Sequence, residues 1–173
     1  MNASYELLLK RRSIRSFKED AVPEETLGKI LAAGRYAPSA LGRQNRFFSV
    51  VQDRGLMERI LTAAQKNGAA FVPRHTPFYH APDVVVVSAP ETFRFNREDA
   101  ACALENLMLA ACALGLGSCC LGSVLPGLRD PEIAAELKLP HGYVPYGCVC
   151  IGYPAASAPQ PKPRRDDDTV ILR

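Results

Sequence analysis

Four consecutive valines, Val84 to Val87, are the feature that most limits what this chain can fold into. An unbroken run of β-branched residues predicts a strand, over 83–88, that is buried on both faces. Such a strand needs a sizeable core, and a chain of 173 residues, 47% hydrophobic and 23% charged, is long and apolar enough to form one. We therefore expect a single domain over residues 1–173, without internal repeats.

Apolar periodicity and turn residues predict the other elements. The predicted helices begin at Ser4, as N-cap, and at Pro23, and cover 56–66, 96–114 and 131–137. The other predicted strands cover 47–52, 118–122 and 144–152. The stretch 67–82 contains three prolines and predicts a long loop, and loops of that length inside compact domains are often functional.

Charge and hydropathy exclude several classes of protein. The most apolar helical stretch, 100–117, contains Glu105 and Asn106, which indicates a buried helix and not a membrane span. The chain reaches Glu6 and Lys10 without a long apolar run, so we predict no signal peptide and a cytoplasmic location. A net charge of +3 and the lack of an aromatic-basic stripe argue against nucleic-acid binding. The positive charges are local, which favours a small anionic ligand.

The six cysteines allow two interpretations. No CxxC pair is present, and the three histidines have no ligand spacing relative to the cysteines, so we predict no metal site. Cys148 and Cys150 point to one face of a predicted strand, and the neighbours Cys119 and Cys120 cannot easily bridge each other. We expect buried free thiols in a reducing compartment, with a redox-active thiol pair as the alternative.

Two clusters of basic residues lie near the two ends of the chain. The first is Arg11-Arg12-Ser13-Ile14-Arg15, and the second is Pro161-Lys162-Pro163-Arg164-Arg165. Arginine offers planar, forked donors and keeps its charge, so two such clusters suit a phosphate that is held from two sides. Prolines keep the second cluster extended. The alternative is a pair of solvated basic surface patches.

Four motifs, in this order, resemble those of the FMN-dependent nitroreductase family. They are Arg11-Arg12-Ser13-Ile14-Arg15-Ser16-Phe17, then Ala37-Pro38-Ser39-Ala40 with Arg43-Gln44, then the segment Ala110 to Cys119, and finally Ile151-Gly152-Tyr153-Pro154 with the second basic cluster. Each motif alone has little specificity, but together they span nearly the whole chain. The sequence thus resembles a short, single-domain member of that family.

The resemblance implies which residues would bind FMN. Arg11 and Ser13 would contact the phosphate and ribityl chain, with Arg12 beside them, and Arg164 with Lys162 would close on the phosphate from the other side. Two-electron reduction places negative charge near the pyrimidine edge of the flavin ring, and a fixed cation there stabilises it. The resemblance assigns that position to Arg15.

The same resemblance places other residues around the flavin ring. Small residues permit a close approach of backbone N–H groups to the reactive flavin nitrogen. Those N–H groups would belong to Leu121, Gly122 and Ser123. Gln44 would hydrogen-bond the ring edge. The loop covering the ring, contributed by the partner subunit, would contain Pro38, Ser39 and Ala40.

The chain departs from the family pattern in three respects. Gly42 stands where the family often has Asn, and Asn45-Arg46 stands where it often has Pro-Trp. Arg46 favours an acidic or phosphate-bearing substrate, unless it is a rim residue. The chain is also short, so its candidate lid is the loop 67–82, which contains Phe71, Arg74, Phe78 and Tyr79.

The fold implied by the resemblance is α+β with three layers: a mixed central sheet flanked by helices. The protein would be an obligate homodimer, with the tail Thr169 to Arg173 embracing the partner. NAD(P)H would reduce FMN and leave, and an electron-poor small molecule, such as a nitroaromatic or quinone, would be reduced next in a ping-pong cycle. The flavin carries the chemistry, so no catalytic side chain is required.

Two alternatives to this function remain. One is a specialised reductase of the same fold, such as a dehalogenase or a flavin-processing enzyme. The other is a non-catalytic flavin-binding protein. Neither a nucleic acid nor a membrane is an expected partner.

Overall fold

The structure, a computed structural model, describes residues 2–71 and 76–173. Its helices are α1 (Ala3–Lys10), α2 (Glu24–Arg35), α3 (Arg54–Lys66), α4 (Asn96–Ala113), α5 (Leu125–Leu128) and α6 (Pro131–Glu136), with a 3-10 turn, η1, at Ala40–Gly42. Its strands are β1 (Phe47–Val51), β2 (Asp83–Pro90), β3 (Gly117–Leu121) and β4 (Tyr143–Gly152). The predicted helices and strands are all present, with ends within about two residues of those expected. The short helix α5 was not predicted.

The central sheet is antiparallel except at one edge. Over the described residues it has four strands in the order β1-β2-β4-β3, and each neighbouring pair runs antiparallel. A parallel pairing occurs beside β3, where Ser13 bridges Ser118. The four strands therefore form an antiparallel sheet and not the mixed sheet expected, because the segment before α2 joins the edge at a single point and does not form a full strand.

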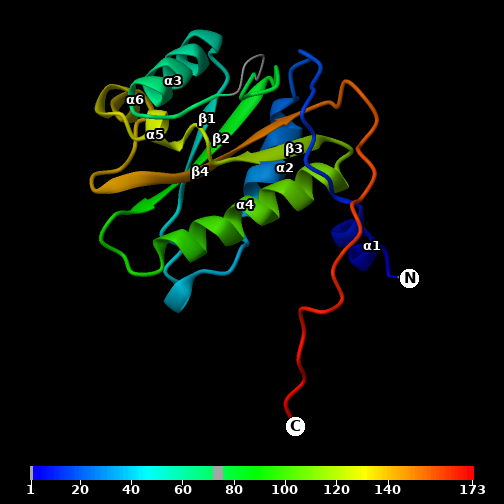
Figure 1. The fold of residues 1–173 in the computed structure, drawn as a ribbon. Helices are drawn as coiled ribbons and strands as arrows, with labels where there is room; N and C mark the ends of the chain where they lie inside the picture. The colour runs from blue at the N-terminus through cyan, green and yellow to red at the C-terminus, as the bar shows by residue number, and fades with distance from the viewer. Residues whose placement is uncertain (1, 72–75) are drawn as a thin grey trace.

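The valine run of β2 separates two cores, as its pattern predicted. Val84 and Val86 pack into the core beneath α3, α5 and α6. Val85 and Val87 pack into the core beneath α2 and α4. All of these valines are fully buried, and Figure 1 shows the two groups of helices on opposite faces of the sheet. The α+β fold of three layers is confirmed.

Two helix starts differ from the prediction for the same physical reason. Asn2, not Ser4, is the N-cap of α1, and its side chain accepts a hydrogen bond from the Ser4 backbone N–H at 2.8 Å. Helix α3 begins at Arg54 because the Asp53 side chain caps it, accepting from the Leu56 N–H. In both cases a short polar side chain, placed before the apolar pattern begins, accepts a hydrogen bond from a backbone N–H of the first turn that has no partner within the helix.

The candidate lid is only partly a surface loop. Phe78 has 6% of its surface exposed and belongs to the core beneath α3, so the expectation that it covers a channel is wrong. Phe71 packs against the edge of the same core. Arg74 lies outside the described residues.

The C-terminal segment leaves the body of the molecule after β4. Residues 155–173 form no helix or strand and are exposed along their length. The tail runs past α1 and away from the sheet, as Figure 1 shows. No helix within 2–71 and 76–173 combines the length and the apolar character needed to cross a membrane.

Candidate functional site

The first basic cluster is an extended segment bound to the edge of β3. The Ile14 N–H donates to the Ser118 carbonyl at 2.9 Å, and Ser13 bridges Ser118. The Ile14 side chain is buried against Gly117, where an added Cβ would lie 2.8 Å from the isoleucine. Side chains alternate along extended backbone, so burial of Ile14 directs its neighbours Ser13 and Arg15 to the other side.

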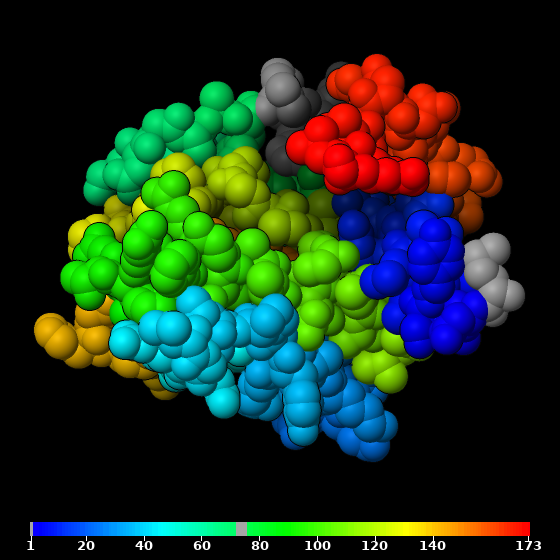
Figure 2. Space-filling view, turned by 90° about the horizontal axis from the view of Figure 1, so that it is seen from below, coloured from blue at the N-terminus to red at the C-terminus, as the bar shows by residue number. Residues whose placement is uncertain are grey.

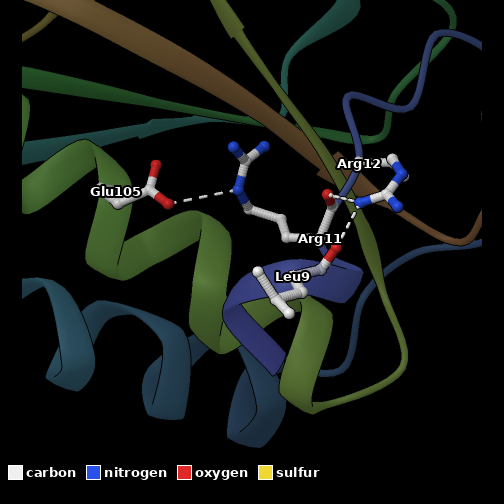
Figure 3. Close-up of polar contacts among 4 residues, drawn as sticks. All are labelled: Leu9, Arg11, Arg12 and Glu105. Carbon is white, nitrogen blue, oxygen red and sulfur yellow. Dashed lines mark hydrogen bonds and ion pairs between the residues drawn. The ribbon is translucent and has the colours of Figure 1, made fainter. Parts of the chain in front are cut away.

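Arg11 and Arg12 point in different directions, as Figure 3 shows. The Arg11 Nε donates to Glu105 Oε1 of α4 at 3.2 Å. The Arg12 Nη1 donates to the carbonyls of Leu9 and Arg11, at 2.6 and 2.7 Å. Arg12 therefore satisfies carbonyls at the end of α1, whereas Arg11 is held on α4 with its terminal amino groups unused by that ion pair.

Arg15 lies between two groups that the sequence analysis did not connect with it. The positive charge of its guanidinium acts on both the Tyr79 hydroxyl and the Cys119 thiol. Burial raises the pKa of both Tyr79 and Cys119, and the positive charge of Arg15 opposes that rise. Tyr79 and His80 both have positive φ angles, 54° and 64°, which are uncommon for residues other than glycine. Such backbone strain clusters at functional sites.

The turn after β3 leaves its backbone open. Leu121 is buried, whereas Gly122 and Ser123 are exposed. A Cβ added to Gly122 would meet no atom within 4 Å, so a ligand can approach this backbone directly. The turn follows the strand to which Ser13 is bridged, so Ser13 and Gly122 lie along one edge of the sheet.

The loop with Pro38, Ser39, Ala40 and Gln44 lies at the opposite end of α4 from α1 (Figure 1). The Ala40 N–H donates to Asp99 Oδ1, in the first turn of α4, at 2.8 Å. Asp99 precedes Glu105, the partner of Arg11, by a helical rise of about 9 Å. The loop and the first basic cluster therefore contact α4 at different positions along its length.

The second basic cluster has no contact with the first in this structure. Lys162 and Arg164 are exposed, and among the described residues no hydrogen bond or ion pair involves either side chain. Arg165 instead pairs with Asp167 at 2.8 Å. The tail starts beside the first cluster, however.

A surface pocket joins the start of the tail to the first cluster. Ser13–Ser16 share this pocket of about 280 Å³ with Ala156, Ser157 and Pro159. Figures 1 and 2 both place the beginning of the tail beside the N-terminal residues. Lys162 lies three residues beyond Pro159, within a reach of about 10 Å along extended chain.

The pockets that adjoin the predicted residues are small. One of about 220 Å³ contains Lys10 and Arg12, and one of about 250 Å³ contains Arg35, Gln44 and Arg46. Pockets that enclose a small-molecule ligand usually measure about 300–1,000 Å³. None of these three pockets alone, the 280 Å³ one included, has the volume of a typical cofactor site.

The cysteines are free thiols, as predicted. Cys119, Cys148 and Cys150 are buried in the core beneath α3, and Cys120 is exposed. Burial raises the pKa of the Cys148 and Cys150 thiols, which disfavours the reactive thiolate. Within the described residues no group of three or more His, Cys, Asp or Glu side chains could hold a metal ion.

Comparison with known proteins identifies the family. The model of the Nitroreductase family matches residues 8–153. An oxygen-insensitive NADPH nitroreductase of Salmonella typhimurium is 31% identical, over 99% of this chain and 73% of that protein. An iodotyrosine deiodinase of Thermotoga neapolitana is 27% identical, over 100% of this chain and 98% of that protein.

A solved structure gives the same answer. The nitroreductase of Bacteroides fragilis, crystallised with bound FMN, superposes with a TM-score of 0.86 at 31% identity, over 100% of both chains. The family match covers three of the four motifs that suggested the resemblance and the first part of the fourth, up to Tyr153. The chain belongs to the nitroreductase family.

Proposed function

We propose that this protein is an NAD(P)H-dependent FMN oxidoreductase that reduces an electron-poor small molecule and works as a homodimer. The observation that carries the proposal is the extended Arg11–Arg15 segment. It is bridged to β3 in a fold that superposes on an FMN-bound nitroreductase with a TM-score of 0.86. Forked cationic donors and a hydroxyl on one edge of a sheet suit a flavin phosphate and its ribityl chain.

Donor chemistry at the first cluster fits the phosphate end of FMN. The Nε of Arg11 is used by Glu105, which orients the side chain and leaves its terminal amino groups for phosphate oxygens. Ser13 lies in the same extended segment. Arg164 and Lys162 would approach from the tail, whose first residues already line a pocket with Ser13. Arg12 is occupied with carbonyls and would contribute charge but no direct contact.

The ring end of FMN would lie along the turn after β3. Arg15 would bind the pyrimidine edge, close to Tyr79, on whose hydroxyl its positive charge acts. The exposed backbone at Gly122 and Ser123, next to Leu121, would approach the reactive nitrogen, since no side chain blocks it. When bound, FMN supplies the hydride chemistry in two half-reactions, first with NAD(P)H and then with a nitroaromatic, quinone or similar acceptor.

Three features support a homodimer as the working form. The family resemblance assigns the loop of Pro38, Ser39, Ala40 and Gln44 to the flavin of a second copy, and in this chain the loop is anchored at Asp99, about 9 Å along α4 from the partner of Arg11. The pockets of a single chain are small. Exposed apolar side chains mark an interaction surface, and they include Tyr5, Leu8 and Leu9 of α1 and Val170, Ile171 and Leu172 of the tail.

A second candidate function is dehalogenation within the same fold. The 27% identity to an iodotyrosine deiodinase over 98% of that protein's length is the observation that favours it. A halogenated aromatic acceptor would use the same flavin and the same Arg11–Arg15 segment. Comparison of turnover with a nitroaromatic, a quinone and a halophenol would distinguish the two activities.

An absorption spectrum of the purified protein, followed by anaerobic NADH or NADPH, tests the proposal. We expect a flavin spectrum that bleaches on addition of the nicotinamide and recovers on addition of the acceptor alone, as a ping-pong cycle requires. A colourless protein that does not take up added FMN would contradict the proposal. A flavin spectrum that does not bleach would support instead a non-catalytic flavin-binding protein.

A further inference from the structure

Arg46 lines the pocket of about 250 Å³ that also contains Gln44, but its guanidinium donors bind the backbone of its own chain. Its guanidinium turns back onto the end of α2 and donates to three backbone carbonyls. These belong to Pro38 at 2.7 Å, Ala37 at 2.9 Å and Arg35 at 3.2 Å. The expectation of a rim residue agrees with this pocket, whereas the donors bound to these carbonyls are not free for an acidic substrate.

The contacts of Arg46 satisfy the end of a helix. The last carbonyls of a helix have no partner within it, and the helix dipole makes that end favourable for a cation. Arg35 is the last residue of α2, and Ala37 and Pro38 come just after its C-cap residue, Tyr36. Hydrogen bonds from a charged donor are stronger than neutral ones, and a forked guanidinium can bind several carbonyls at once. A tryptophan or lysine cannot make this arrangement.

The other side of the same loop is held by α4. Asp99 is 3% exposed, and its Oδ1 accepts from the Ala40 N–H at 2.8 Å. Its Oδ2 is buried without a hydrogen-bond partner among the described residues. A buried carboxylate oxygen without a partner is costly, so the single contact with Ala40 is maintained against a desolvation penalty.

Between these two supports the loop adopts a strained backbone. Leu41 and Gln44 have positive φ angles of 57° and 54°, and Gly42 has one of 63°. The Ser39 hydroxyl accepts from the Gln44 N–H at 3.0 Å, and the Arg46 N–H donates to the Gln44 carbonyl at 2.7 Å. Non-glycine residues in this region persist only where the surroundings impose it.

We infer that Arg46 is a positioning residue: together with Asp99 it imposes the conformation in which the loop Pro38–Gln44 covers the flavin and the acceptor. The inference rests on the proposed function for what the loop covers, but not for the conformation itself. Arg46 thus acts through the backbone of Pro38 and Ala37, and it would touch neither flavin nor acceptor.

Amide hydrogen exchange of the flavin-free full chain tests the positioning role. In Arg46→Gln we expect the Ala40 and Gln44 amides to exchange on the order of 10-fold faster, because charged hydrogen bonds of that strength are lost. Arg46→Lys keeps the charge but loses the fork, and should show most of the same increase. Unchanged exchange in both variants would overturn the inference. If Arg46→Gln fails to fold, Arg46→Lys decides alone.

Arg35→Gln is the matched control. The Arg35 side chain lines the same pocket of about 250 Å³, and among the described residues no hydrogen bond or ion pair involves it. Removal of the same charge from the same pocket should leave exchange at Ala40 and Gln44 as in the parent. If Arg35→Gln accelerates exchange as much as Arg46→Gln does, the positioning role of Arg46 is wrong.

Steady-state kinetics of the FMN-loaded protein separate geometry from charge. Arg46→Lys should lower kcat/KM for the acceptor about 10-fold, with the dissociation constant of FMN changed less than about threefold, because the phosphate end is distant. A normal kcat/KM in Arg46→Lys and a reduced one in Arg46→Gln would assign the effect to charge and overturn the inference. If the parent binds no FMN, the proposed function fails, and hydrogen exchange still decides the role of Arg46.

Discussion

The loop Pro38–Gln44 and the C-terminal tail are two parts of the proposed site that are held in opposite ways. The loop is supported from both sides, by Arg46 and by Asp99, and its strained backbone is imposed by the chain itself. The tail from Ala155 onward has no regular structure, and its basic and apolar side chains are exposed. We therefore expect the loop to be preorganised before any ligand or partner arrives, and the tail to be ordered by binding.

This difference implies that the loop and the tail would contribute differently to binding affinity and to acceptor specificity. Preorganised groups contribute without an ordering cost at the moment of binding, whereas a tail that orders on binding loses conformational entropy. The loop suits discrimination among acceptors. The tail suits retention of FMN and of the partner subunit, because both would supply the contacts that order it.

Deletion of residues 160–173 should have the largest effect, because it removes most of the tail and leaves the loop intact. We expect the FMN dissociation constant to rise about 100-fold or more, since two charge-assisted contacts and the apolar end of the tail are lost. The dimer should dissociate at micromolar concentration, as analytical ultracentrifugation would show. The exchange rate of the Ala40 amide should stay unchanged, because the loop does not depend on the tail. Full FMN retention would contradict this account.

Two glycines at the ends of β3 test the packing of the folded body, to which the first basic cluster is bound. Gly117→Ala places a Cβ 2.8 Å from Ile14 and should lower the free energy of unfolding by about 1–3 kcal/mol, displacing the first basic cluster. Gly122→Ala is the matched control, because its Cβ meets nothing within 4 Å. It should stay within about 0.5 kcal/mol of the parent in urea denaturation. Equal losses in both variants would refute the packing argument.

Arg164→Ala tests one residue of the tail. Loss of one charged contact should weaken FMN binding about 10-fold in an equilibrium titration, with the reduction potential of the flavin unchanged. Arg165→Ala is the matched control, since Arg165 is paired with Asp167 at 2.8 Å. An equal effect of both variants would mean that the tail contributes only general positive charge.

Arg15→Ala should give the smallest effect. This effect should arise at the ring end of the flavin, opposite the phosphate. Loss of the cation should lower the two-electron potential by about 30 mV, equivalent to about 1.4 kcal/mol, and slow the uptake of hydride from NAD(P)H. FMN affinity should change little, because the phosphate end stays bound. Anaerobic redox titration and stopped-flow reduction measure the two quantities. Unchanged reduction kinetics would show that Arg15 does not serve the ring edge.

Much of the fold follows from local pattern. The valine run predicted a strand buried on both faces, and the structure places alternate valines in two cores. Helix α5 escaped prediction because a four-residue helix that contains proline and glycine has no periodicity to detect. It exists because Gly127 lets it approach α3 closely, with an added Cβ only 2.1 Å from the Ile60 carbonyl oxygen.

For the predicted site residues, too, the local pattern indicated a segment but not the contacts that each side chain makes. The motif Arg11–Arg15 indicated one candidate segment, but the sequence could not show that Arg12 turns to the end of α1 or that Arg11 meets Glu105. Tyr79 was considered only as part of a lid, although the positive charge of Arg15 acts on its hydroxyl. The contacts of Arg11 and Tyr79 join residues distant in the chain, so no local spacing encodes them, whereas Arg12 takes partners one and three residues away.

By itself, the amino-acid sequence determined the layers of this protein, the order of its elements and its family, because burial pattern and motif order are local properties of the chain. Only the tertiary structure decided which donors of those motifs stay available. It used Arg12 at the end of α1, turned Arg46 onto the carbonyls after α2, and left Lys162 and Arg164 in solvent. The reason is physical: a guanidinium binds whichever unsatisfied oxygens the fold brings within its reach.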